Sequence, residues 1–412
     1  MHGFDKLIGH VKTYGFEHRQ LYAVSIMIFF FAIFDGIFSF ITPIYIVQQG
    51  ISESMMGIII GTSSIAGLLF DFILCRVLKD TKYRLIYLVV FVICMIYPLV
   101  LYQAKSALIF IIAMALWGLY YDLVNIGNLD FITRTSKAKE YSSNFGVLRI
   151  FLDLGYLLAP LITGFLIIEI IDYKPFVAAW VFLILAFICY FVTIFIAQQS
   201  RQKNKADKQI TSDGFLSEFK LWKKISHYII PVLAVSFMLN IVDAIYWTIG
   251  PLLSESMSFL GDLGGLFMTA YVLPPLFVGW FVGSITSKYG KKRTAFMSLF
   301  LGSLFLMLFP VFDWPIALVV LSFLSSFCTS FASPAIAAAY ADYIHETPQV
   351  EKEITTIQDS FVNIGYIIGP IMAGFSGQYL GHLTTFCLLG VLGIFVSLYL
   401  LKFTPKKINI KI

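Results

Sequence analysis

The chain has 412 residues, of which 59% are hydrophobic and only 13% are charged. Because an ordinary soluble protein has about a quarter charged residues, this composition excludes a typical soluble domain. The net charge of +5 is no indication of nucleic-acid binding, because the distribution of the basic residues along the chain is what carries information.

The first twenty residues are polar and mixed, and the apolar residues after them come in long blocks rather than in amphipathic stripes. This N-terminal segment lacks the apolar core of a cleaved signal, so we expect the first block to stay as a helix. A helix needs about 20 apolar residues to cross a bilayer. We therefore expect an all-α membrane protein with twelve transmembrane helices, at residues 22–47, 55–75, 84–102, 107–133, 142–168, 176–197, 228–252, 260–285, 294–312, 315–343, 355–375 and 382–403.

The basic residues alternate between the two sides of this predicted arrangement. If the N-terminus is cytoplasmic, 26 of the 29 Lys and Arg residues fall in the N-terminal segment, the inner loops or the C-terminal tail. The outer loops hold only Lys105 and Lys174, and Arg149 lies within a span. The positive-inside rule therefore places both termini in the cytoplasm, and we expect a multi-pass protein of the cell membrane.

No sequence pattern indicates an enzyme, a cofactor or a metal site. The five cysteines are scattered through the apolar blocks without metal-ligand spacing, and the six histidines are not clustered. There is no nucleotide-binding loop, no His-Glu-x-x-His and no nucleophile elbow. We therefore expect no catalytic residue, no metal and no cofactor.

The two halves of the chain share a repeated pattern. The stretches AIFDGIFSFITP at 32–43 and NIVDAIYWTIGP at 240–251 have Asp, Ile and Pro at the same spacing, 208 residues apart. Farther along, DLGYLLAPLITGF at 153–165 and NIGYIIGPIMAGF at 363–375 share Gly, Tyr, Pro, Gly and Phe at an offset of 210. With two further matches, four segments repeat in the same order, which indicates a duplication.

Those two further matches are the glycines Gly57 and Gly265, and the segments DFITRT at 130–135 and DYIHET at 342–347. An even number of spans in each copy makes the repeats parallel, and parallel repeats place a substrate site between the halves near the bilayer midplane. We therefore divide the chain into an N-terminal six-helix bundle at 1–197, a cytoplasmic linker at 198–227 and a C-terminal six-helix bundle at 228–412.

The inner loop between the eighth and ninth spans reads GSITSKYGKKR, residues 283–293. It is similar to the motif Gly-x-x-x-Asp-Arg/Lys-x-Gly-Arg/Lys-Arg/Lys, with Ser287 in place of the Asp. Together with the twelve spans and the duplication, it makes the whole chain resemble the major facilitator superfamily of secondary transporters. The N-terminal copy, CRVLKDTKYR at 75–84, keeps the basic charge and loses both glycines. The resemblance implies a gate loop formed by Gly283, Lys288, Gly290, Lys291 and Lys292.

The fifth span is similar to a pattern typical of drug:proton antiporters, Gly-x8-Gly-x3-Gly-Pro-x2-Gly-Gly. The residues that match are Gly146, Gly155, Pro160 and Gly164, and the eleventh span repeats the pattern with Gly365, Gly369, Pro370 and Gly374. Ala159 and Thr163 replace two of the glycines. Small residues allow close helix packing in any transporter and proline kinks a helix, so the pattern only favours export. The Arg usual in the fourth span of antiporters is missing, because no basic residue lies between Lys105 and Arg134.

Several carboxylates lie within the apolar blocks, where an Asp at a helix centre costs roughly 2.5–3.5 kcal/mol. Those nearest mid-depth are Asp35, Asp243, Asp122 and Asp153, whereas Asp71, Asp130, Asp342 and Asp359 lie closer to the cytoplasmic ends and favour gate or helix-end roles. A carboxylate in a site of low dielectric constant can load and release a proton near neutral pH. The alternative is a permanently protonated Asp that makes a hydrogen bond between helices. The predicted proton-coupling residues are Asp35, Asp243, Asp153 and Arg149.

Aromatic residues accompany these carboxylates. In the resembled fold the first and seventh spans line a central cavity at equivalent positions, which implies that Asp35 and Asp243 face each other across it. Carboxylates beside aromatic rings suit a cationic, partly apolar ligand, although a chain with 17% aromatic residues has rings in every span. The predicted substrate-binding residues are Asp35, Phe38, Trp117, Tyr121, Asp122, Tyr246 and Trp247.

Arg149 and Asp153 lie four residues apart in the fifth span, on one face of a helix. Arg149 is about 12 Å inside the span, and a charged guanidinium there needs a partner or water. We expect an ion pair that faces the cavity, with Asp153 binding a proton or a cationic substrate and Arg149 competing for it. A fixed pair that only holds the helix is an equal alternative.

These observations predict a secondary active transporter that works by alternating access, with proton-coupled export of an amphipathic or cationic compound as the first interpretation. Proton symport of a small polar nutrient is an alternative, and four asparagines could bind such a solute: Asn125, Asn128, Asn144 and Asn240. A receptor or scaffold without transport is a third, disfavoured by the mid-membrane carboxylates. The expected partners are a small-molecule substrate, protons and the lipid bilayer, without nucleic acid, and the expected state is a monomer.

Overall fold

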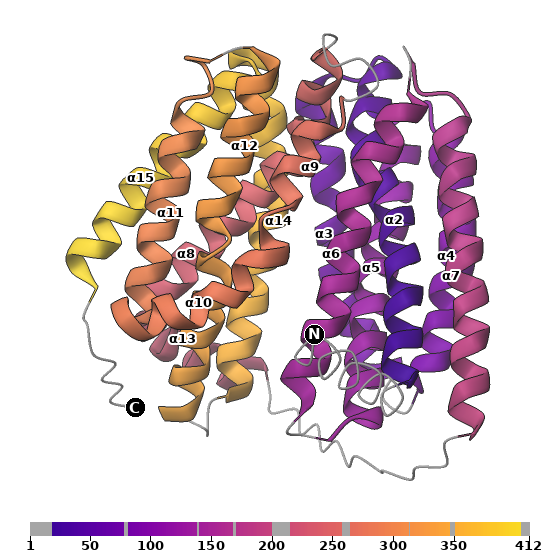
Figure 1. The fold of residues 1–412 in the computed structure, drawn as a ribbon, viewed down its shortest axis with the longest axis horizontal. Helices are drawn as coiled ribbons and strands as arrows, with labels where there is room; N and C mark the ends of the chain where they lie inside the picture. The colour runs from indigo at the N-terminus through magenta and orange to yellow at the C-terminus, as the bar shows by residue number, and fades with distance from the viewer. Residues whose placement is uncertain are drawn as a thin grey trace, which may run out of the picture.

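The computed structural model describes residues 19–77, 81–137, 140–167, 170–199, 215–257, 264–312, 314–346 and 351–404, and every regular element in these ranges is a helix (Figure 1). The N-terminal half contains α2 (Arg19–Gln48), α3 (Glu53–Val77), α4 (Tyr83–Tyr102), α5 (Ala107–Thr135), α6 (Tyr141–Leu166) and α7 (Lys174–Gln199). The C-terminal half contains α8 (Phe215–Ser256), α9 (Leu266–Val272), α10 (Pro275–Tyr289), α11 (Lys291–Met307), α12 (Pro315–Thr329), α13 (Ala332–Glu346), α14 (Glu351–Leu380) and α15 (His382–Phe403).

The helices follow the predicted spans in order. Within the described residues, ten helical segments are long and apolar enough to cross a membrane, and the bent pair Leu266–Gly279 and Phe281–Tyr289 adds one more. The remaining predicted span, 294–312, corresponds to α11 and is only 17 residues long as a helix. The two halves stand side by side in Figure 1, with α2–α7 in one group and α8–α15 in the other.

One predicted element differs from the structure. The eighth span is not one continuous helix, because Leu273 and Pro274 separate α9 from α10, and a further break between Gly279 and Phe281 bends the path by 69°. A proline supplies no backbone N–H and clashes with the preceding turn, so consecutive prolines end a helix. Helix α8 begins at Phe215 and runs for 42 residues, so the second part of the predicted linker 198–227 is helical, and the bounds of the linker stay a prediction. Residues 200–214 lie outside the described part.

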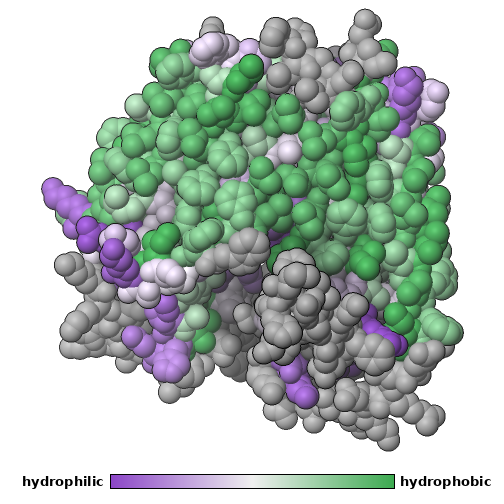
Figure 2. Space-filling view, in the orientation of Figure 1, coloured by the Kyte–Doolittle hydropathy of each residue, from purple (hydrophilic) through white to green (hydrophobic). Residues whose placement is uncertain are grey.

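The helices are apolar on most of their surface. Figure 2 shows hydrophobic residues over the broad middle of the molecule and hydrophilic residues toward its margins. Large exposed side chains such as Leu85, Val92, Phe195 and Phe395 contribute to this belt. Exposure of such a large apolar surface to water would be unfavourable, whereas in a bilayer the same surface contacts lipid tails. The protein is therefore a multi-pass membrane protein, and the side of its termini stays a prediction.

The core of the N-terminal half is built around α2, which packs against α6 and α7. Its middle segment is almost continuously buried from Phe31 to Ile46. Aromatic rings fill this core, with Phe38 edge-on to Tyr97 at 5.1 Å and to Phe176 at 5.6 Å between ring centroids. Because rings interlock in fixed relative orientations, this packing makes α2 a rigid support for the carboxylate that it carries.

Candidate functional site

Asp35 lies in the middle of α2 and is 1% exposed. Its Oδ1 accepts hydrogen bonds from the indole Nε1 of Trp117 at 3.0 Å and from the hydroxyl of Tyr120 at 2.5 Å. The hydroxyl of Tyr156 on α6 donates to Oδ2. Two different helices thus supply three donors to one carboxylate, which compensates the cost of burying a polar group in an apolar environment.

Asp243 in α8 has the same arrangement in the C-terminal half. The hydroxyl of Tyr271 on α9 donates to Oδ1 at 2.7 Å, and the hydroxyl of Tyr366 on α14 donates to Oδ2 at 2.6 Å. Tyr156 and Tyr366 occupy matching positions of the sequence repeat, as do Asp35 and Asp243. Each half therefore has one carboxylate from its first helix bound to a tyrosine from its fifth helix.

The arrangement of Asp35 and Asp243 across a cavity, which the resemblance implies, stays a prediction. Each carboxylate is bound by hydroxyls of its own half. The reason is that the tyrosines on the fifth helix of each half lie beside the first helix, where they donate to the carboxylate oxygens. Asp35 is enclosed, whereas Asp243 is partly exposed.

An aromatic contact joins the two halves next to Asp35. The ring of Tyr156 contacts the ring of Trp247 on α8, with centroids 5.8 Å apart and planes inclined by 61°. The hydroxyl of the same tyrosine binds Asp35. Tyr156 thus touches the carboxylate of one half and an aromatic residue of the other, so a change at Asp35 can reach the interface through one side chain.

The predicted ion pair in α6 is present. Arg149 Nε lies 2.9 Å from Asp153 Oδ1 and donates to Oδ2 at 3.1 Å. The side chain of Arg149 is 69% exposed, whereas that of Asp153 is 12% exposed. Tyr121 on α5 is 47% exposed.

The other predicted substrate-binding residues are distributed differently. Phe38 and Tyr246 are fully buried in aromatic cores. Asp122 packs against Gly67 of α3, within its own half. Trp117 and Trp247 are partly buried, beside Asp35 and Tyr156 respectively. Of the predicted set, the tyrosine at 121 is therefore the residue with most accessible surface.

The predicted gate loop contains a sharp turn between α10 and α11. Gly290 has φ of +86°, a conformation that glycine adopts without the strain of a Cβ atom. Lys291 then places its Nζ 2.6 Å from Asp342 Oδ1 on α13. In the other half Asp130, the repeat equivalent of Asp342, accepts from the backbone N–H of Tyr83 at 2.9 Å. Both aspartates thus anchor the start of a neighbouring helix.

Of the remaining loop residues, Gly283 has open space around it. Lys288 lies over the ring of Tyr289 at 5.3 Å, and Lys292 lies over the ring of Tyr343 at 5.9 Å. The side chain of Asp71, for which the sequence favours a gate or helix-end role, lies outside the described residues. The loop is therefore a set of local contacts within one half.

The halves touch at the end that the charge distribution predicts to be outside. There α3 packs on α14, and α6 packs on α9. A Cβ atom added to Gly57 would overlap the carbonyl oxygen of Pro370, and one added to Gly265 would overlap that of Pro160. The repeated glycines of the second spans thus meet the repeated prolines of the fifth spans, in opposite halves. We call these two approaches the glycine–proline contacts.

Polar bonds join the same end of the two halves. His382 Nε2 at the start of α15 lies 3.0 Å from Glu53 Oε2 at the start of α3. The side-chain oxygen of Gln378 accepts from the backbone N–H of Ser54 at 2.9 Å. These bonds and the glycine–proline contacts hold the two halves together at the predicted outer end.

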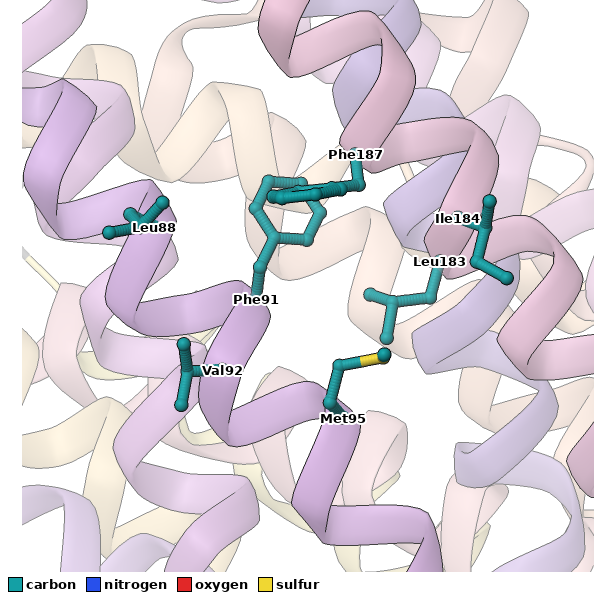
Figure 3. A pocket seen from close by; sticks show the side chains of 7 residues that line it. All are labelled: Leu88, Phe91, Val92, Met95, Leu183, Ile184 and Phe187. Carbon is teal, nitrogen blue, oxygen red and sulfur yellow. The ribbon is translucent and has the colours of Figure 1, made fainter.

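A separate apolar pocket lies between α4 and α7, away from the carboxylates (Figure 3). Phe91 and Phe187 meet at one end, and Met95 approaches Leu183 at the other. It has no polar lining residue. A pocket without polar groups on a lipid-facing surface offers nothing to orient a polar ligand, so it is not a candidate for the transport site.

The sequence profile of the Major Facilitator Superfamily matches residues 24–260 and again residues 232–410. The chain belongs to the major facilitator superfamily. It is 21% identical over 364 residues to the Quinolone resistance protein NorA of Staphylococcus aureus, which covers 87% of this chain and 89% of NorA. Membership agrees with the predicted two-half helical fold, and members of this superfamily are transporters rather than enzymes.

Solved structures of other superfamily transporters have the same fold. The nucleoside transporter NupG superposes with a TM-score of 0.72 at 15% identity and covers 94% of this chain and 100% of NupG. The peptide transporter POT in complex with sulfate gives 0.69 at 14% identity, with 94% of each chain covered. A bacterial homolog of the human lysosomal transporter Spinster, in an inward-facing and unoccupied conformation, gives 0.67 at 11% identity, with 93% and 95% covered.

In this superfamily member the sequence analysis missed the tyrosines that bind the carboxylates. Tyr156 and Tyr366 were available as a repeated residue, because they are the shared Tyr in DLGYLLAP and NIGYIIGP. Tyr120 and Tyr271 have no such repeated pattern. Their role depends on helix packing, which brings together residues far apart in the chain.

Proposed function

We propose that this protein exports an amphipathic small molecule across the cell membrane by proton-coupled alternating access. The observation that carries the proposal is the duplicated site in which Asp35 and Asp243 each bind tyrosine hydroxyls near the middle of the membrane. A buried titratable group with specific partners is a candidate functional site, and intramembrane carboxylates mark proton relays in pumps and transporters.

A change of protonation has a structural consequence at these sites. An ionised carboxylate only accepts, and the hydroxyls of Tyr120 and Tyr156 both donate to Asp35. A protonated carboxyl group has a donor of its own, so one of its partners must rotate and accept. Because Tyr156 also packs against Trp247 of the other half, proton loading at Asp35 can alter the contact between the halves.

The direction of transport is proposed from two observations. The fifth helix has a glycine and proline pattern like that of drug:proton antiporters, and the relative at 21% identity is described as a quinolone resistance protein. Uptake of a small polar nutrient has less support, because three of the four candidate asparagines bind groups of their own half. Asn128 accepts from Tyr87, Asn144 donates to Ser136 and Asn240 donates to a backbone carbonyl.

The test is transport by purified protein in proteoliposomes. Radiolabelled amphipathic compounds of cationic, neutral and anionic character are loaded, and a pH gradient or a sodium gradient is imposed separately. We expect at least one compound to move against its gradient when the pH gradient is imposed, and to stop when an ionophore collapses it. Movement that follows sodium without a pH gradient contradicts proton coupling, and counterflow of none of the compounds contradicts transport of amphipathic solutes.

A further inference from the structure

Arg149 uses only one edge of its guanidinium group in its ion pair. Both contacts with Asp153 run through Nε, at 2.9 Å to Oδ1 and 3.1 Å to Oδ2. An Arg side chain has five N–H donors, and four of them are on the two terminal nitrogens. With the side chain 69% exposed, this terminal edge is directed away from Asp153 and toward accessible space.

Arg149 lies close to a contact between the two halves. Arg149, Asp153 and Tyr156 lie on one face of α6, at helical spacing, and Tyr156 contacts Trp247 of the other half. The exposed guanidinium is therefore about two helical turns from an aromatic contact that joins the halves.

The carboxylates do not offer an equivalent site for a cation. Asp35 is buried with three donors on its two oxygens, and Asp153 is bound by Arg149. Both oxygens of Asp243 in the other half already accept hydroxyls. A cation would compete with these donors, whereas an anion can reach the terminal nitrogens of Arg149 without breaking a described bond.

We propose that the terminal edge of Arg149 binds the carboxylate of an aromatic, amphipathic substrate. Carboxylate and guanidinium match in a planar, bidentate geometry, and the ring of Trp247, which packs on Tyr156 of the same face of α6, offers apolar surface for the rest of the substrate. This assignment rests on the proposed transport function and replaces the cationic substrate expected from the sequence. The C-terminal half has no equivalent cation, because Asp359 occupies the matching position of α14, so the site is single and asymmetric.

The test measures binding in nanodiscs by calorimetry, with three probes of the same size: 1-naphthoate, the neutral 1-naphthamide and the cation 1-naphthylmethylammonium. The main variant is the pair Arg149→Gln with Asp153→Asn, which removes both charges and leaves no unpaired buried carboxylate. We expect its affinity for naphthoate to fall about tenfold to a hundredfold, the range for a lost hydrogen bond to a charged group. The affinity for the amide should stay unchanged.

Two further variants separate binding from structural support. Asp153→Asn alone keeps Arg149 and removes its competitor, so it should bind naphthoate at least as tightly as the unmodified protein. Arg84→Gln removes a positive charge of the same half at the start of α4 and should leave all three affinities unchanged. Thermal unfolding of each variant in the nanodisc checks that the protein remains folded.

The proposal is overturned if the unmodified protein binds naphthoate no better than the cation, or if the double variant binds naphthoate as well as the unmodified protein. These outcomes are distinct from failure of the proposed function. Transport of other compounds driven by a pH gradient, together with naphthoate binding that ignores Arg149, refutes only the anion site. Naphthoate binding that depends on Arg149, without any transport driven by a pH gradient, refutes only the proton coupling.

Discussion

Replacing Gly57 by Ala places a methyl group where α3 meets α14 of the other half. The added Cβ atom would overlap the carbonyl oxygen of Pro370 and lie 3.1 Å from the backbone of Gly374. All of these atoms belong to backbone, so no flexible side chain can move aside. The two helices must separate at this end, and we expect the variant to favour conformations in which the halves are apart there.

The size of the effect follows from the cost of overpacking. Inserting a methyl group into a well-packed contact costs about 1–3 kcal/mol, and a factor of ten in a population corresponds to about 1.4 kcal/mol. The contact should therefore become about fivefold to a hundredfold less populated relative to the open conformation. Alternating access needs both the conformation in which α3 touches α14 and the one in which they are apart. The transport rate should therefore fall as the population of the touching conformation falls.

Cross-linking measures this population directly. The backbone N–H of Ser54 and the side-chain oxygen of Gln378 are 2.9 Å apart when the halves touch. Cysteines at these two positions, in a chain whose five native cysteines are replaced by Ala, should be joined rapidly by a short bifunctional thiol reagent unless Gly57 is also changed. Gly146→Ala is the matched control, because a Cβ atom added at this helical glycine meets nothing within 4 Å.

We expect slow cross-linking and slow transport with Gly57→Ala, and normal values for both with Gly146→Ala. If the Gly57 variant is cross-linked as fast as the control and transports normally, the glycine–proline contacts are not required for closure and the reasoning is wrong. If cross-linking slows while transport is unchanged, the contact forms but does not limit the transport cycle.

Three further predictions concern the site itself. Asp35→Asn and Asp243→Asn should each abolish accumulation driven by a pH gradient while the protein still unfolds cooperatively, because Asn keeps the shape but cannot titrate; accumulation by both variants in proportion to the gradient would make these residues structural. Tyr156→Phe removes one donor from an ionised carboxylate, so the half-maximal point of the pH–rate profile should move to higher pH; an unchanged profile would contradict a role in proton coupling. Exchanging Arg149 and Asp153 moves the guanidinium about 6 Å along the helix into a buried position. Coupled transport and naphthoate binding should therefore both be lost. Full activity of the exchanged variant would show that the ion pair only holds the helix.

Local features of the sequence determined the helices, the duplication and the ion pair. Each apolar block specifies a membrane helix because hydrocarbon leaves backbone groups no other partners. The pairing of Arg149 with Asp153 follows from the helical repeat alone, since residues four apart share a face. The repeated segments DLGYLLAP and NIGYIIGP likewise indicated two halves without any knowledge of their packing.

Only the tertiary structure decided which residues complete the site. Asp35 is bound by side chains 82, 85 and 121 residues away, and no helical period relates such distant positions. The same holds for Gly57, whose backbone contact with Pro370 depends on how closely α3 and α14 approach. Sequence pattern located the carboxylates at mid-depth, but the free-energy cost of burying them determined that hydroxyls of their own half bind them. The same packing leaves the side chain of Arg149 exposed while Asp35 is enclosed.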